Sequence, residues 1–114
     1  MIALIKRLWN LHVHRRFFET PLERNFRMAG ELDASPAAKA LYYADSLRAL
    51  GFAYQVTMFR DWLTDEPRYA VNVHGTYYEP ASGFVTDEPR RIGKIRMPQS
   101  VDDFETWAET RGLL

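Results

Sequence analysis

The hydrophobic periodicity of the sequence changes at Gly51, and this change restricts the folds that the chain can adopt. Before Gly51, apolar residues recur every three to four positions, as expected of amphipathic helices. After Gly51, apolar and polar residues alternate in short runs rich in tyrosine, valine, threonine and phenylalanine, as expected of half-buried strands. Helices that precede a group of consecutive strands predict an α+β fold and not a doubly wound parallel one.

The expected helices carry recognisable start and stop signals. Ser35 and Pro36 together suit a helix start, because serine caps the first N–H groups and proline fits the first helical position. Gly51 suits the position just past a helix end. The helices expected from such signals cover residues 2–18, 36–50 and 101–110. A further short helical turn is expected within residues 21–34.

Short strands are expected after the second of these helices. Their ranges are 52–59, 69–74, 76–79, 84–85 and 91–97. The links between them have hairpin length, which implies antiparallel pairing. We therefore expect a single α+β domain over residues 1–114, with N-terminal helices, a mainly antiparallel sheet of about four to five strands and a C-terminal helix. Its parts are an N-terminal helical segment (1–34), a helix plus antiparallel sheet (35–97) and a C-terminal helix (98–114).

Composition excludes several kinds of chemistry. The 114 residues include no cysteine, which excludes disulfides, thiolate metal sites and a cysteine nucleophile. Lysine plus arginine equal aspartate plus glutamate at 15 each, and this zero formal charge disfavours general nucleic-acid binding. No apolar run approaches the length of a membrane-spanning helix or of a signal-peptide core, so we expect a cytoplasmic protein.

Two segments in the middle of the chain resemble a known pattern. Residues 46–52 read SLRALGF at a helix end, and residues 69–80 read YAVNVHGTYYEP. In this order and spacing they resemble transglutaminase-like domains, which belong to the papain-like cysteine protease class, over about residues 35–85. In that family a nucleophilic Cys opens the helix, a His opens the later strand and an Asp precedes the proline, and these three residues form the catalytic triad.

The residues at the corresponding triad positions differ from those of the family. The Cys position falls near Pro36, the His position holds Tyr69 and the Asp position holds Glu79. Proline offers no nucleophile, and tyrosine is a poor base at neutral pH because its pKa is about 10. The resemblance therefore implies a degenerate triad without catalytic residues, in a domain that keeps a binding role. Ser35 stands beside the Cys position, where helix capping is the simpler explanation.

The sequence predicts no metal site and no cofactor. His12 and His14 are two positions apart, so on a helix they point in different directions and cannot share a metal ion. His74 precedes Gly75, and the pair is typical of an exposed turn. The glycines stand singly and form no phosphate-binding loop. Residues 64–68 and 86–90 both read TDEPR, and we expect two similar acidic turns there.

The expected N-terminal helix offers an alternative function. Its polar face carries a candidate basic surface formed by Lys6, Arg7, Arg15 and Arg16. Such a face suits an anionic membrane or nucleic acid, but it is also typical of a helix whose apolar face packs on the core, on a second copy or on a partner. We expect a protein partner, with self-association as an option, rather than nucleic acid or a membrane.

Tyrosine and tryptophan are dense in the middle of the chain, which favours a protein-binding surface. These side chains are preferred at interfaces because each has one apolar and one polar end. The candidate partner-binding residues are Tyr69, Tyr77, Tyr78, Trp62 and His74. The leading hypothesis is a non-catalytic protein-binding domain that serves as an inhibitor, adaptor or assembly component. The alternative is a small hydrolase or transferase that uses Glu79 with Tyr69 or His74.

Overall fold

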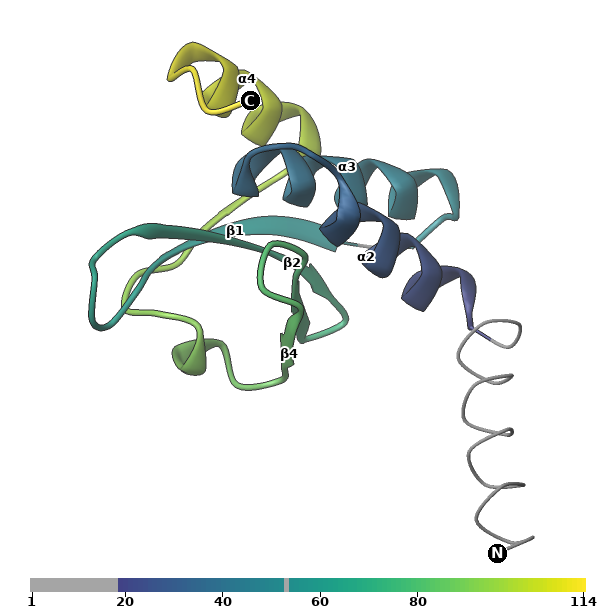
Figure 1. The fold of residues 1–114 in the computed structure, drawn as a ribbon, viewed down its shortest axis with the longest axis horizontal. Helices are drawn as coiled ribbons and strands as arrows, with labels where there is room; N and C mark the ends of the chain where they lie inside the picture. Colours follow the sequence, from purple (N-terminus) through teal and green to yellow (C-terminus); the bar gives the residue numbers. More distant parts are fainter. Residues whose placement is uncertain (1–18, 53) are drawn as a thin grey trace, which may run out of the picture.

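The computed structural model describes residues 19–52 and 54–114. The described helices are α2 (Pro21–Glu31), α3 (Pro36–Ala49) and α4 (Val101–Thr110). The strands are β1 (Tyr54–Arg60), β2 (Pro67–Val73), β3 (Thr76–Glu79), β4 (Phe84–Thr86) and β5 (Met97–Gln99), and a short 3-10 helix, η1 (Pro89–Arg91), follows β4. Helices before and after an antiparallel sheet confirm the expected α+β fold (Figure 1).

The strands form one antiparallel sheet in the order β4-β3-β2-β1-β5. β1 and β2 pair along their whole length, from Tyr54↔Val73 to Arg60↔Pro67. The β2–β3 hairpin turns at His74 and Gly75, which both have positive φ, as a two-residue type I′ turn requires. Because β4 and β5 are the two edges of the sheet, residues 87–96 between them must cross one of its faces. We call these residues the crossing segment.

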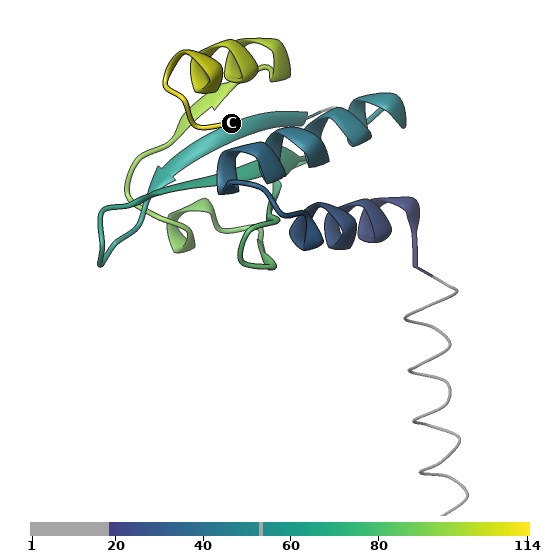
Figure 2. The same ribbon diagram turned by 45° about the horizontal axis from the view of Figure 1, so that its top comes forward.

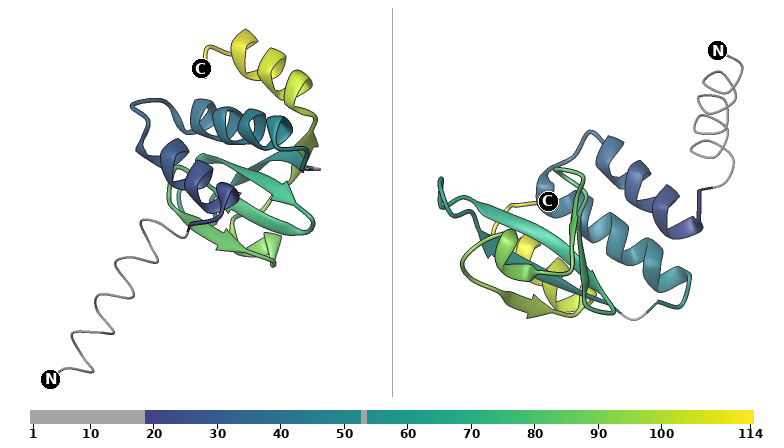
Figure 3. Two further views of the ribbon diagram at one scale, coloured as in Figure 1. Left: turned by 90° about the vertical axis from the view of Figure 1, so that its right-hand side faces the viewer. Right: turned by 90° about the horizontal axis from the view of Figure 1, so that it is seen from below.

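The helices and the crossing segment cover opposite faces of the sheet (Figure 1). α3 packs against β1 and β2, α2 lies beside α3, and α4 contacts α3 and β1 (Figure 2). Figure 3 shows the same layers from the side and from below. The main core between helices and sheet includes Tyr43, Leu47 and Val71. A second, smaller cluster beneath the crossing segment includes Phe59 and Ile92.

Local sequence explains where each helix begins. Thr20, Ser35 and Ser100 each accept a hydrogen bond through the side-chain oxygen from the backbone N–H three residues later. α2 is a full helix and not the short turn expected within 21–34. Thr20 and Pro21, which as a pair interrupt the preceding periodicity, are an N-cap and a first-turn proline for this new helix.

The strand expected at 91–97 is wrong, because only Met97–Gln99 pairs with β1. Ile92 is fully buried in the smaller cluster. A Cβ added to Gly93 would lie 2.2 Å from the carbonyl oxygen of Arg60, so glycine permits a very close approach to β1. The backbone N–H of Lys94 donates to that same oxygen at 2.8 Å. These contacts hold the segment across the end of β1 instead of beside it.

Candidate functional site

The structure does not bring the three degenerate triad positions into one site. Side chains alternate between the two faces along a strand. Tyr69 faces the helices, where its ring centroid lies 5.7 Å from that of Phe104, and burial raises the pKa of its hydroxyl. Pro36 opens α3 on the same side of the sheet. Glu79 faces the opposite side, because its partner Arg68 precedes Tyr69 in β2.

Glu79 is the buried partner of an ion pair. Its side chain is 4% exposed, and Arg68 donates to both carboxylate oxygens, from Nε to Oε2 at 2.9 Å and from Nη2 to Oε1. Ser82 Oγ also donates to Oε1, at 2.6 Å. The hydrogen bonds to Glu79 raise the pKa of Arg68, so the guanidinium stays protonated. Both oxygens of the Glu79 carboxylate are therefore committed to holding the fold.

The arrangement supplies no acid–base pair for the expected hydrolase or transferase. Glu79 lies on the opposite face of the sheet from Tyr69. It is also at the opposite end of β3 from His74, which occupies the β2–β3 turn. A proton-transferring pair needs its members within hydrogen-bond reach of one substrate. Ser35 does not replace a nucleophile either, because its hydroxyl donates to the carbonyl of Leu113 and caps α3.

The candidate partner-binding aromatics do not form one surface. Tyr69 and Tyr77 are buried, and Tyr78 is half-buried against Phe26 and Tyr43. The remaining two candidates, Trp62 and His74, are exposed but lie at opposite ends of β2. The tyrosines are buried because the helices cover one face of the sheet and the crossing segment covers part of the other.

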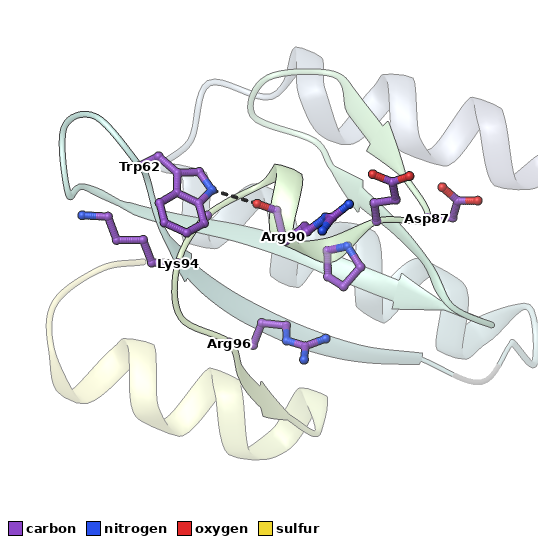
Figure 4. A pocket seen from close by; sticks show the side chains of 8 residues that line it. Trp62, Asp87, Arg90, Lys94 and Arg96 are labelled. Carbon is purple, nitrogen blue, oxygen red and sulfur yellow. Dashed lines mark hydrogen bonds between the residues drawn. The ribbon is translucent and has the colours of Figure 1, made fainter.

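Trp62 lies at the wall of a cleft between the β1–β2 loop and the crossing segment (Figure 4). This cleft, which we call the Trp62 cleft, has a volume of about 550 Å³, and the crossing segment contributes Asp87, Arg90, Lys94 and Arg96 to its lining. Trp62 is 56% exposed, yet its indole is held in place, because Nε1 donates to the carbonyl of Arg90 at 2.8 Å. The ammonium of Lys94 lies 6.0 Å from the indole centroid, within cation–π range.

Asp61 shapes the loop that carries Trp62. Its Oδ1 accepts hydrogen bonds from the backbone N–H groups of Leu63 at 2.8 Å and Thr64 at 3.1 Å. These bonds hold the pKa of the Asp61 carboxyl below its usual range, with a smaller contribution from Arg68. Leu63 is 95% exposed. The loop therefore presents two large apolar side chains to solvent from a hydrogen-bonded turn.

Positive charge exceeds negative charge by one in the lining of the Trp62 cleft, which holds Arg90, Lys94 and Arg96 beside Asp87 and Glu88. The crossing segment carries two acidic residues, Asp87 and Glu88, and four exposed cations, Arg90, Arg91, Lys94 and Arg96. Across residues 19–52 and 54–114, none of these four cations takes part in a salt bridge. No carboxylate in the described residues neutralises their charge through a salt bridge, and this charge is available to an anionic ligand. Sequence reasoning named Trp62 but missed the cations beside it, although four cations within residues 90–96 were a visible signal.

Several expectations fall outside the described residues or concern features absent from them. The helix expected at 2–18, with its basic surface of Lys6, Arg7, Arg15 and Arg16 and the pair His12 and His14, lies outside the described part of the chain. In the part that is described, no three histidine, aspartate or glutamate side chains gather as metal ligands. None of the helices in that part has the length and apolar character needed to cross a bilayer.

Comparisons of this chain with protein-family models, with curated proteins and with solved structures found no match. The resemblance to transglutaminase-like domains therefore stays a prediction from residues 35–85.

Proposed function

We propose that this chain is a non-catalytic protein-binding domain and that the Trp62 cleft is its binding surface. The observation that carries the proposal is an indole that is more than half exposed and is held by a hydrogen bond to the Arg90 carbonyl. Tryptophan is among the residues most enriched at the energetic centres of interfaces. A ring that is already fixed loses little conformational entropy when a partner covers it.

Other features of the same surface support a protein partner. Leu63 follows Trp62 in the same loop, and two exposed apolar residues in succession give apolar area that a partner can bury. The exposed cations around the ring provide a polar rim of the kind found at interfaces. Because Glu79 and Tyr69 lie on opposite faces of the sheet, the geometry favours binding over catalysis.

The proposal keeps the wider role expected from the sequence. The domain acts as an inhibitor, adaptor or assembly component on a degenerate transglutaminase-like core, and the order of α3, β1, β2 and β3 is what supports that core. A cytoplasmic location belongs to the same proposal, since a cysteine-free chain fits a reducing compartment.

A peptide selection tests the proposed surface. Random peptides displayed on phage are selected against the purified full chain, and the affinities of the selected peptides are measured by fluorescence polarisation. Trp62→Ala is expected to weaken their binding by about tenfold or more, the loss typical of a central interface tryptophan. Met28→Ala, at an exposed apolar residue of α2, is the matched control and should leave binding unchanged.

Circular dichroism confirms that both variants are folded before binding is compared. Peptides that bind the Trp62→Ala protein as tightly as the unmodified protein would overturn the proposal. A selection that enriches no peptide above background would have the same consequence.

A further inference from the structure

A second, smaller cavity adjoins the Trp62 cleft. It has a volume of about 260 Å³ and is lined by Gln55, Thr57, Tyr77, Arg96 and Pro98. Arg96 also lines the Trp62 cleft, so the two cavities meet at this one side chain. Figure 4 shows that Arg96 and Trp62 lie on different sides of the larger cleft and come from separate segments of the chain.

The strand register explains why the sheet is hollow at this point. Thr57 of β1 lies opposite Ala70 of β2 on one side and opposite Pro98 of β5 on the other. Side chains of paired residues point to the same face, and threonine and alanine are both small. Taller neighbours, among them Tyr77 of β3, stand around this low point. The cavity is therefore built into the pairing of the strands and does not depend on a mobile loop.

The walls of the small cavity contain hydrogen-bonding groups that the fold does not use. Thr57 is 2% exposed and Tyr77 is 9% exposed. Neither hydroxyl forms a hydrogen bond with any other residue in the described ranges 19–52 and 54–114. Neither oxygen is among the fully enclosed unpartnered atoms of the described residues, so both hydroxyls remain open to the cavity and can donate to a ligand atom there.

The chemistry of the lining selects an anionic oxygen ligand. Arg96 offers N–H donors and a positive charge that no salt bridge in the described part of the chain neutralises. The Thr57 and Tyr77 hydroxyls add two more possible donors on the same cavity wall. A carboxylate accepts several such bonds at once, and those from a guanidinium are the strongest.

We infer that the partner of this domain presents an acidic segment, with a carboxylate in the small cavity on Arg96, Thr57 and Tyr77 and an apolar side chain on Trp62. This inference rests on the proposed function and names the chemistry of its partner. The carboxylate belongs to an aspartate or glutamate side chain or to a chain terminus. In each case the same guanidinium and hydroxyls bind it.

The inference is tested on the peptides obtained by the selection described above. Their sequences should contain more aspartate and glutamate than the starting library. Arg96→Gln is expected to weaken their binding about tenfold, because a charged hydrogen-bonded contact is lost. Arg24→Gln, which removes an exposed arginine of α2, is the matched control for the change in net charge and should have no effect. Comparing each peptide with a free and with an amidated C-terminus shows whether the carboxylate comes from a side chain or from the chain terminus.

A double-mutant cycle tests whether Arg96 and the acidic residue of the peptide interact directly. Changing the critical acidic residue of the peptide to its amide should weaken binding to the unmodified protein as much as Arg96→Gln does. The same peptide change should cause no further loss with the Arg96→Gln protein, because the two changes remove one interaction. Thr57→Val should weaken binding of the acidic peptide. It should leave the thermal stability of the free protein unchanged or higher, since the Thr57 hydroxyl has no partner in the described fold.

Two outcomes would overturn the inference while sparing the proposed function. One is a set of peptides that need Trp62 but bind the Arg96→Gln protein with unchanged affinity. The other is additive losses in the cycle, which would show that Arg96 and the acidic residue do not meet. Failure of the proposed function is recognised separately, because its peptides would bind the Trp62→Ala protein as tightly as the unmodified one.

Discussion

Replacing Gly93 by alanine tests how the Trp62 cleft is built. Gly93 is buried, and an added Cβ would lie 2.2 Å from the carbonyl oxygen of Arg60 and 2.7 Å from its carbonyl carbon. Ordinary van der Waals contacts begin at 3.4 Å. The crossing segment must therefore move away from β1 by about 1 Å to accommodate the methyl group. Since both contacts are to backbone atoms, no side-chain rotation can relieve them.

The cost of this movement can be worked out from its parts. Forcing an extra methyl group into a packed site costs about 1–3 kcal/mol. The hydrogen bond from the Lys94 N–H to the Arg60 carbonyl, now 2.8 Å long, is worth about 1 kcal/mol and is weakened by the shift. We expect a net loss of about 2–3 kcal/mol in the free energy of unfolding. For a chain of this length that loss lowers the melting temperature by about 8–12 °C.

Thermal and urea unfolding followed by circular dichroism measure the effect. Gly93 does not have a left-handed φ, so without the close contact alanine would stabilise the protein by about 0.4–1 kcal/mol, through its effect on the unfolded chain. The sign of the change in the free energy of unfolding therefore shows whether Gly93 lies against the Arg60 carbonyl. A Gly93→Ala protein as stable as the unmodified one, or more stable, would refute the close approach. Gly51→Ala is a comparison with no atom within 4 Å, in which only the positive φ of 81° adds strain.

Two further predictions concern groups buried in the fold. Glu79→Gln removes the counter-charge of the partly buried Arg68 and should lower the free energy of unfolding by about 2–4 kcal/mol in urea titrations. Glu105→Gln, at an exposed residue of α4, should change it by less than about 0.5 kcal/mol, and equal effects would contradict the role given to the pair. Burial raises the pKa of the Tyr43 hydroxyl in the folded protein. As the pH rises, this hydroxyl therefore loses its proton in the unfolded chain before it does so in the folded one. Its contribution to the free energy of unfolding is complete below about pH 10 and is lost as the pH rises above that value. In urea titrations at increasing pH, the free energy of unfolding should fall less steeply for Tyr43→Phe than for the unmodified protein. An equally steep fall in both proteins would contradict burial of the hydroxyl.

Much of the fold could be predicted because its signals are local. Ser35 and Ser100 each cap the helix that follows, and Gly51 and Gly112 both take positive φ just beyond a helix end. The alternation of apolar residues in the sequence predicts β1 and β2, although burial in these strands does not alternate strictly, because Phe59 and Ala70 are buried in the second cluster. These features depend on residues within a few positions of one another.

The candidate site could not be predicted in the same way, because it joins distant parts of the chain. Trp62 was predicted as a partner-binding residue, but its hydrogen bond to the Arg90 carbonyl spans 28 positions. Burial of Tyr69 and Tyr77 follows from what covers each face of the sheet. The small cavity exists because Thr57 lies opposite Ala70 in the register, which no local pattern specifies.

The two TDEPR segments separate what the sequence determined from what the tertiary structure decided. In both, the threonine hydroxyl accepts a hydrogen bond from the backbone N–H two residues later, at 3.3 Å in 64–68 and 3.0 Å in 86–90. Such a turn is made by neighbouring residues, so five identical letters produce it twice. Beyond the turn the copies diverge. Pro67 enters β2 and its arginine is paired with Glu79, whereas Pro89 enters η1 and its arginine lines the Trp62 cleft. The difference is imposed by the surroundings, because the first copy precedes a strand that finds partners on both sides and the second must cross the sheet to reach its other edge.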